Sequence, residues 1–167
     1  RGKELYYGGH VGNFKFRLIL PVTYHRKLVT YIGRDLAEKS SSPYRNLEDE
    51  ASVIPPKSTL YGFDEASPGS NIVIVEGPID QWKLGPGAVA TLGAAWTNEQ
   101  VSKIKELNPN KVIILYDTEE EAQNSAKKLS KQIWFCDCEN FQLNGVKDPG
   151  ELSLEESKEV MERVQKL

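Results

Sequence analysis

The second half of the chain alternates short apolar runs with longer amphipathic segments, and this alternation restricts the fold more than any other feature. IVIVEG, AVATLG and KVIILYD contain short apolar runs typical of buried parallel strands, and QIWFCDC at 132–138 is expected to be a fourth. TNEQVSKIKEL and TEEEAQNSAKKLSK, between them, carry apolar residues at helical spacing. Strands that alternate with helices build βαβ units, so we predict an α/β fold with a parallel sheet of about four strands flanked by helices.

Capping boxes mark the expected starts of three helices, because a Ser or Thr is followed three residues later by Glu or Gln. The three pairs are Thr97 with Gln100, Thr118 with Glu121, and Ser153 with Glu156. The last of these starts a C-terminal helix that we place at 151–167. The linker-like SPGSN at 67–71 separates the α/β part, expected at 71–150, from what precedes it.

The front of the chain is expected to form a smaller β-rich lobe at 1–66. Residues 14–32 read as two strands around YHRK, a turn candidate, and 38–59 reads as loop. The predicted fold is therefore an antiparallel lobe followed by a parallel α/β unit.

Composition limits the class of protein. The 167 residues, 39% hydrophobic and 27% charged, suit one domain with a small appendage and exclude wholesale disorder. Since no apolar run approaches the roughly 20 residues of a membrane span and no signal peptide is evident, we expect a cytoplasmic location. The chain begins at Arg1, and we expect it to be a piece of a longer protein. Cys136 and Cys138 stand one residue apart inside an apolar run, a spacing that suits neither a zinc site nor a disulfide framework.

The net charge of −3 hides an asymmetry between the two parts. Residues 1–46 hold nine Lys and Arg against three acids, a net +6, so the remaining residues carry −9. A basic front and an acidic back suit a protein that faces phosphates with one part and holds cations with the other. The alternative is an ordinary solvated surface with chance clustering.

Acidic side chains follow the predicted strands at their carboxyl ends, the edge where open parallel sheets bind ligands. The acids are Glu76, Asp80, Asp117, Glu119 and, after the fourth strand, Asp148. Crowded carboxylates repel one another, and a hard divalent cation such as Mg²⁺ relieves that repulsion. Each acid also has a structural alternative, since Asp often caps turns and acids in a first helical turn favour the macrodipole.

Several short motifs stand in a family order and carry a resemblance. VEGPID, ATLG, ILYDTEEEAQNSA and KDPGEL resemble the TOPRIM domain of bacterial DnaG-type and phage primases. In the front lobe, RLILPV, IGRDL, PYRN and KSTLYGFDEA resemble the segments that precede TOPRIM in those primases. The resemblance covers about residues 14–155. It implies a primase core that makes short RNA primers on a single-stranded DNA template from ribonucleoside triphosphates, with a replicative helicase as a further partner, in a bacterial cytosol or a phage-infected cell.

The resemblance also implies roles for individual residues. It assigns catalysis to Glu76, Asp117 and Glu119, which with Asp80 and Asp148 would bind two Mg²⁺ or Mn²⁺ ions for nucleotidyl transfer. One ion would activate the primer 3′-hydroxyl, and the other would hold the triphosphate and the leaving pyrophosphate. Nucleotide and DNA phosphates would contact basic side chains, namely Arg17, Arg34, Arg45 and Lys57.

The chain departs from the family pattern at functional positions. The DxD motif reads Asp117-Thr118-Glu119, and the Asp-Pro-Asp motif reads Asp148-Pro149-Gly150, so one acid is longer and another is missing. The Lys of Lys-Tyr-x-Asn is Pro43, which leaves Arg45 as the nearby substitute. A divergent primase and a weakened catalyst both fit these changes. The alternatives are a non-catalytic TOPRIM module that binds nucleic acid or a partner, and a TOPRIM nuclease, against which the basic front lobe argues.

Overall fold

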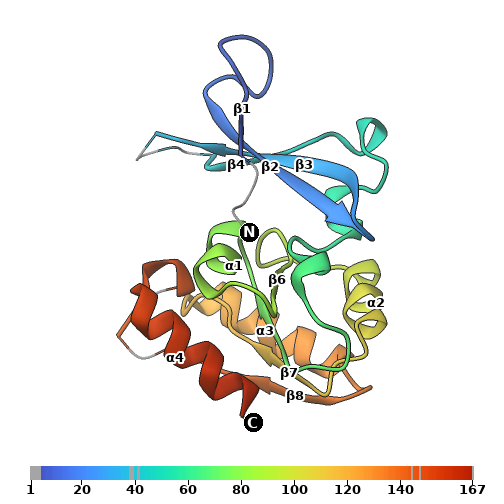
Figure 1. The fold of residues 1–167 in the computed structure, drawn as a ribbon, viewed down its shortest axis with the longest axis vertical. Coiled ribbons are helices and arrows are strands. Elements are labelled where there is room, and N and C mark those ends of the chain that lie inside the picture. The colour runs from blue at the N-terminus through green and yellow to red at the C-terminus, as the bar shows by residue number, and fades with distance from the viewer. Residues whose placement is uncertain (1–4, 38–39, 41, 144, 147, 167) are drawn as a thin grey trace.

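The computed structural model describes residues 5–37, 40, 42–143, 145–146 and 148–166. Parts of the segments named above lie outside these ranges: residues 1–4 (with Arg1), 38–39 and 41 of the predicted 1–66 lobe, Lys147 of the KDPGEL motif, and residue 167 of the predicted 151–167 segment. Two four-stranded sheets organise the described chain. Figure 1 shows the antiparallel sheet above the unit that holds the parallel one. The predicted fold class is therefore confirmed.

The antiparallel lobe has the strand order β1-β2-β3-β4. Its strands are β1 (Tyr6–Tyr7), β2 (Arg17–Tyr24), β3 (Lys27–Asp35) and β4 (Tyr44–Asn46). The predicted turn joins β2 to β3, and His25 and Arg26 at its centre have φ values of 50° and 62°. Two positive φ values in a two-residue loop give the turn a twist that matches the strands. Short 3₁₀ helices, η1 (Asp49–Ala51), η2 (Pro56–Ser58) and η3 (Phe63–Glu65), lead to the second unit.

The parallel sheet has the order β6-β5-β7-β8 and is crossed by helices on both faces. Its strands are β5 (Ile72–Val75), β6 (Ala88–Ala90), β7 (Lys111–Ile114) and β8 (Asp137–Asn140). The helices are α1 (Pro78–Leu84), α2 (Asn98–Glu106), α3 (Glu120–Gln132) and α4 (Leu154–Gln165), with the 3₁₀ helix η4 (Pro149–Glu151) before α4. Among the helices of the described chain, none is long and apolar enough to cross a membrane.

Alternate residues of the central strands feed two separate cores. Ile72 and Ile74 of β5 pack with residues of α2 and α3, whereas Val73 and Val75 pack with α1, α4 and the lobe. Leu20, Val22 and Ile32 are the lobe's contribution to the second core. The lobe is thus fixed to the α/β unit by shared apolar burial, which stabilises the geometry of anything built between them.

A polar cluster fixes the far end of the lobe. The Tyr24 hydroxyl donates to both carboxylate oxygens of Glu106 in α2, at 2.8 and 2.7 Å. His25 Nε2 lies 2.9 Å from Glu106 Oε1, and Lys103 Nζ lies 3.7 Å from the centre of the Tyr24 ring. The β2–β3 turn is therefore held onto α2.

Three local expectations are wrong. The segment 38–59, expected to be loop, contains β4, because the backbone of Tyr44–Asn46 pairs with β3 and so extends the antiparallel sheet. The fourth strand is Asp137–Asn140 rather than 132–138, because Ile133 closes α3 and is buried there, and the ladder with β7 begins at the Lys111–Asp137 pair. The Thr118–Glu121 capping box does not form, since α3 begins at Glu120 and its N-cap is Glu119. The other two predicted boxes, at Thr97 and Ser153, are present.

Candidate active site

A cleft of about 490 Å³ lies between the lobe and the carboxyl ends of the parallel strands. One wall comes from β3 and β4, and the floor comes from the segments that follow β5, β6 and β7 together with η4. This is the edge where parallel sheets place ligands, because strand ends and helix starts leave backbone groups free there. The cleft is therefore the first candidate for a functional site.

Cross-strand pairing builds the lobe wall of the cleft. Arg34 pairs with Tyr44 and Ile32 pairs with Asn46, so these four side chains share one face, and all four line the cleft. The Arg34 guanidinium carbon lies 4.7 Å from the centre of the Tyr44 ring, which orients the cation by a cation–π contact. Burial raises the pKa of the Tyr44 hydroxyl, which therefore stays protonated as a hydrogen-bond donor.

Four carboxylates from four separate segments form the floor. Glu76 follows β5, Asp80 lies in the first turn of α1, Asp117 follows β7, and Asp148 precedes η4. Glu76 Oε1 accepts from the Asp117 backbone N–H at 3.1 Å, which ties two strand ends together. Asp80 Oδ2 accepts from Gly77 N–H at 2.9 Å, and Asp148 Oδ1 accepts from Glu151 N–H at 3.1 Å. The structure thus brings four of the five predicted acids together.

The proximity of these acids perturbs their titration. Burial, followed by the Asp117 charge, raises the pKa of Glu76 to about 7. Burial raises the pKa of Asp80 to about 7, with Asp148 and Asp117 adding to the effect. Burial and then the Asp148 charge raise the pKa of Asp117 to about 6. The site is therefore a place where negative charge is costly and a cation is favoured.

The donor set suits a hard divalent cation. All four groups offer carboxylate oxygens, the ligands that Mg²⁺ prefers. Asp117 Oδ1 is buried and has no hydrogen-bond partner among the described residues, so it is available as a ligand. No group of three or more acidic, His or Cys side chains among the described residues is already arranged around a single point. The residues fit Mg²⁺ in kind, and water or substrate oxygens would complete its shell.

The fifth predicted acid, Glu119, lies at the edge of the cleft. It is exposed, is the N-cap of α3, and is not among the described residues that line the cleft. Its charge still contributes to the raised pKa of Glu76 and of Asp117. Glu119 is therefore close enough to act electrostatically on the floor.

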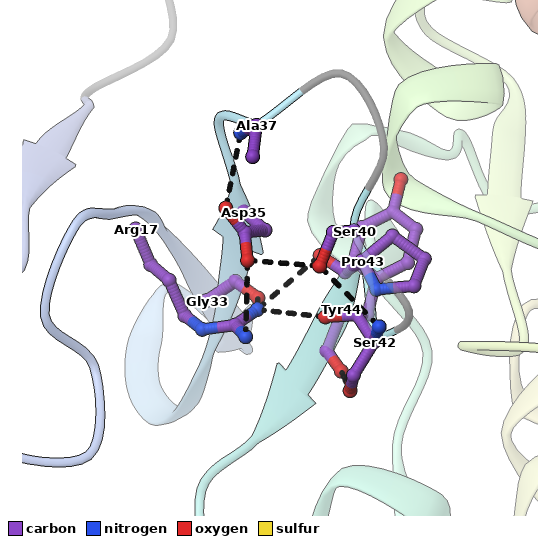
Figure 2. A network of polar contacts seen from close by, with 8 residues as sticks. All are labelled: Arg17, Gly33, Asp35, Ala37, Ser40, Ser42, Pro43 and Tyr44. Atoms are coloured by element: carbon purple, nitrogen blue, oxygen red, sulfur yellow. Dashed lines mark hydrogen bonds and ion pairs between the residues drawn. The ribbon is translucent and has the colours of Figure 1, made fainter.

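Arg17 is held in a network at the strand ends of the lobe (Figure 2). Its guanidinium lies 3.4 Å from Asp35 Oδ2 and donates to the carbonyls of Ser42 at 3.1 Å and Pro43 at 3.4 Å. It faces away from the cleft wall, because it pairs with Asp35 while Leu18 pairs with Arg34. Gly33 lies against it, since a Cβ there would meet the Arg17 side chain at 2.9 Å.

Lys57 donates hydrogen bonds from its ammonium group to three carbonyls of one loop, at 91–95. Nζ donates to the carbonyls of Thr91 at 3.2 Å, Leu92 at 2.8 Å and Ala95 at 2.7 Å. Leu92 lines the cleft with a φ of 64°, a left-handed conformation that is costly for leucine. Burial lowers the pKa of Lys57, and the Glu76 charge opposes that shift. In this structure Lys57 holds a strained cleft loop in place.

Arg45 shares the face of β4 opposite to Tyr44 and Asn46, and it is exposed. Of the four predicted basic residues, Arg34 alone is among the described residues that line the cleft. Sequence reasoning missed Asn46 as a cleft residue. The alternation in PYRN could have revealed it, because residues two apart on a strand share a face.

Comparisons with known proteins identify a related family and a related protein. Residues 73–153 match the Toprim-like family. The DNA primase of Deinococcus radiodurans is 28% identical over 112 residues, which cover 62% of this chain and 19% of that protein. The chain therefore spans about a fifth of the length of this relative.

Solved structures share the fold. A primase fragment from Aquifex aeolicus with zinc-binding and RNA polymerase domains aligns with a TM-score of 0.74 and 24% identity, covering 97% of this chain and 43% of that one. The primase fragment of the bacteriophage T7 primase-helicase protein aligns with a TM-score of 0.66 and 16% identity, covering 89% and 63%. These findings confirm the resemblance to TOPRIM-containing primases.

Proposed function

We propose that this chain is all or part of the RNA polymerase core of a DNA primase, which makes short RNA primers on single-stranded DNA. One observation carries the proposal: four carboxylates from four segments converge in a cleft whose opposite wall presents Arg34. That arrangement suits nucleotidyl transfer, in which cations and basic groups offset charge on a triphosphate. A solved assembly of the bacteriophage T7 lagging-strand DNA polymerase with primase domains, an RNA/DNA hybrid and dTTP, at a TM-score of 0.61 and 19% identity, is consistent with nucleic acid as the class of ligand.

The cleft residues would have two roles, metal binding and phosphate binding. Two Mg²⁺ or Mn²⁺ ions, held by Glu76, Asp80, Asp117 and Asp148, would supply an activated 3′-hydroxyl and charge neutralisation at the leaving pyrophosphate. Arg34, stacked on the Tyr44 ring, would contact phosphates of the incoming ribonucleotide and of the template strand in the cleft.

The remaining predicted residues act around the cleft. Glu119 would tune the field at the acidic floor, and Lys57 would keep the 91–95 loop in shape. Arg45, exposed on the opposite face of β4, would contact template phosphates outside the cleft. We place this activity in the cytoplasm, with a replicative helicase as a partner, and retain the division into 1–66, 71–150 and 151–167 as the proposed domain organisation.

The test is primer synthesis on single-stranded DNA with Mn²⁺. Glu76→Gln and Asp117→Asn keep the side-chain shape but remove the charge, and each is expected to abolish synthesis. Glu159→Gln makes the same chemical change on an exposed position of α4 and should keep wild-type activity. Circular dichroism checks that each variant is folded.

Other outcomes select other functions. Full activity in either cleft variant would reject the catalytic assignment. No synthesis by the wild-type chain at any metal concentration, with intact DNA binding, would favour the non-catalytic module. Metal-dependent cleavage of DNA in place of synthesis would favour the nuclease.

A further inference from the structure

Gln123 of α3 is a buried glutamine whose amide contacts the strand end that carries Asp117. It is 5% exposed, and its Nε2 donates to the Tyr116 carbonyl at 3.3 Å and to the Asp117 carbonyl at 2.8 Å. Since both carbonyls can only accept, the amide nitrogen must face them. The side chain therefore holds the two peptide groups that flank Asp117.

The other end of the same amide reaches the neighbouring strand. Gln123 Oε1 accepts from Asn140 Nδ2 at 3.1 Å and from Gln142 Nε2 at 2.6 Å. All four hydrogen-bonding positions of the Gln123 amide are thus filled. Asn140 ends β8, and Gln142 begins the segment that continues to Asp148. One side chain consequently links the two strand ends that lead to two of the floor carboxylates.

We propose that Gln123 is a positioning residue for Asp117, and that it acts through the Tyr116 and Asp117 carbonyls. The inference rests on the proposed function only for its catalytic consequence. Asp117 offers a buried Oδ1 that has no partner among the described residues, and its N–H holds Glu76 Oε1. A shift of this short segment would move both carboxylates, because the Asp117 backbone is bonded to Glu76 on one side and to Gln123 on the other.

Gln123 would act on Asp117 as the hydrogen-bond partners behind a metal ligand act on that ligand. Such groups fix the orientation of a ligand without touching the ion, and their loss typically weakens metal affinity about 10- to 100-fold. Gln123→Met has nearly the same shape and keeps the packing of α3, but it offers no donor to either carbonyl. Gln142→Ala removes one outer bond at an exposed position, so this second variant tests the network without disturbing the core.

The matched control is Gln100→Met. Gln100 is also a fully buried helical glutamine, and its Nε2 also donates to two carbonyls, those of Thr59 at 2.9 Å and Thr91 at 2.8 Å. Those bonds join the end of η2 to the segment after β6. In the parallel sheet, β6 and β8 are the two opposite edge strands. Gln100→Met therefore removes a comparable buried amide, together with the bond that its Oε1 accepts from Thr97 N–H, and only Gln123→Met removes contacts to the Asp117 segment.

Two measurements test the proposal on the whole chain. Free Mn²⁺ is titrated by electron paramagnetic resonance, and amide hydrogen exchange is followed at Asp117. We expect Gln123→Met to weaken Mn²⁺ binding by about 10-fold and to speed exchange at Asp117, with a smaller change in the same direction for Gln142→Ala. Gln100→Met should lose a similar amount of thermal stability and leave both quantities within about twofold of wild type.

The outcomes separate this inference from the proposed function. Wild-type exchange at Asp117 in folded Gln123→Met, with unchanged Mn²⁺ affinity, overturns the inference. If Gln123→Met does not fold, unchanged exchange in Gln142→Ala overturns it. If the wild-type chain binds no Mn²⁺, the proposed function fails, and the exchange arm alone decides whether Gln123 positions Asp117.

Discussion

At the scale of single residues, the acidic floor is costly without a cation. Glu76, Asp80 and Asp117 all have raised pKa values because burial and mutual charge both disfavour the ionised form. In the folded chain Asp117 keeps its proton up to about pH 6, and Glu76 and Asp80 keep theirs up to about pH 7, whereas unfolded carboxyls release theirs near pH 4. The metal-free site therefore opposes folding at neutral pH.

This predicts a pH dependence of stability for the metal-free chain. A carboxyl whose folded pKa is raised stabilises the fold below about pH 4, and that contribution is lost as pH rises to about 7. Glu76→Gln should flatten the fall in unfolding free energy between about pH 4 and pH 7, and Glu159→Gln should not. Urea denaturation across this range measures both. Parallel profiles for wild type and Glu76→Gln would show that Glu76 is not perturbed.

Gly150 stands where the resembled motif has its second acid, and a side chain there would displace neighbouring carboxylates. A Cβ would lie 2.9 Å from Asp148 Oδ1 and 3.0 Å from Asp80 Oδ1. We expect Gly150→Ala to lower the unfolding free energy by about 1–2 kcal/mol. Thermal denaturation measures this, with Glu159→Gln at an exposed position of α4 as a control that should change stability by less than about 0.5 kcal/mol.

The same crowding bears on whether the chain is adapted or weakened. Combining Glu119→Asp with Gly150→Asp would restore the family's acids but press a further carboxylate against Asp80 and Asp148. We expect this double variant to make primers more slowly than wild type at every Mg²⁺ concentration. A faster rate with tighter metal binding would show instead that the natural chain is a weakened catalyst.

At the scale of secondary-structure elements, hydrogen bonds at helix starts discriminate between residues that look alike in the sequence. Ser153 Oγ accepts from Glu156 N–H at 3.2 Å, whereas the helix near Thr118 begins after it. Ser153→Ala should therefore cost about 1 kcal/mol, and Thr118→Ala should stay within about 0.5 kcal/mol. Chemical denaturation of the two variants decides this. Equal losses would mean that Thr118 caps α3 after all.

These elements also show what the sequence could predict. The runs at β5 and β7 are buried on both faces, so their apolar character alone marks them as strands. β8 is an edge strand with alternating exposure, and Ile133, Phe135 and Cys136 before it pack in the core instead, while Trp134 is exposed. Apolar character therefore placed that strand too early. The role of Gln123 could not be predicted either, because nothing in the sequence distinguishes a buried helical glutamine from an exposed one.

At the scale of the whole molecule, the cleft depends on how the lobe sits on the α/β unit. The acids could be predicted because they follow strands whose ends share one edge. The basic residues could not be ranked, because their roles depend on which strand face they occupy and which loop they meet. Arg34 reaches the cleft, whereas Arg17 and Lys57 bond to backbone carbonyls.

The position of Arg34 in the cleft predicts how the chain binds nucleic acid. Arg34→Gln should weaken single-stranded DNA binding for all sequences alike and reduce the slope of log affinity against log salt by about one, because one phosphate contact is lost. Arg163→Gln, an equivalent change on α4, should leave both unchanged. Fluorescence anisotropy between about 50 and 200 mM salt measures the slope. Equal slopes for wild type and Arg34→Gln would remove the cleft wall from the binding surface.

The most direct test of the account is a crystal of this chain soaked in Mn²⁺ and measured at the manganese absorption edge. The account predicts anomalous density on the acidic floor, within ligand distance of Asp117 Oδ1 and at least one of Glu76 and Asp80, and its loss in Asp117→Asn. Density confined to other acidic surfaces, or a floor that stays empty at saturating Mn²⁺ while the fold is intact, would contradict the claim that this cleft is a metal-dependent active site.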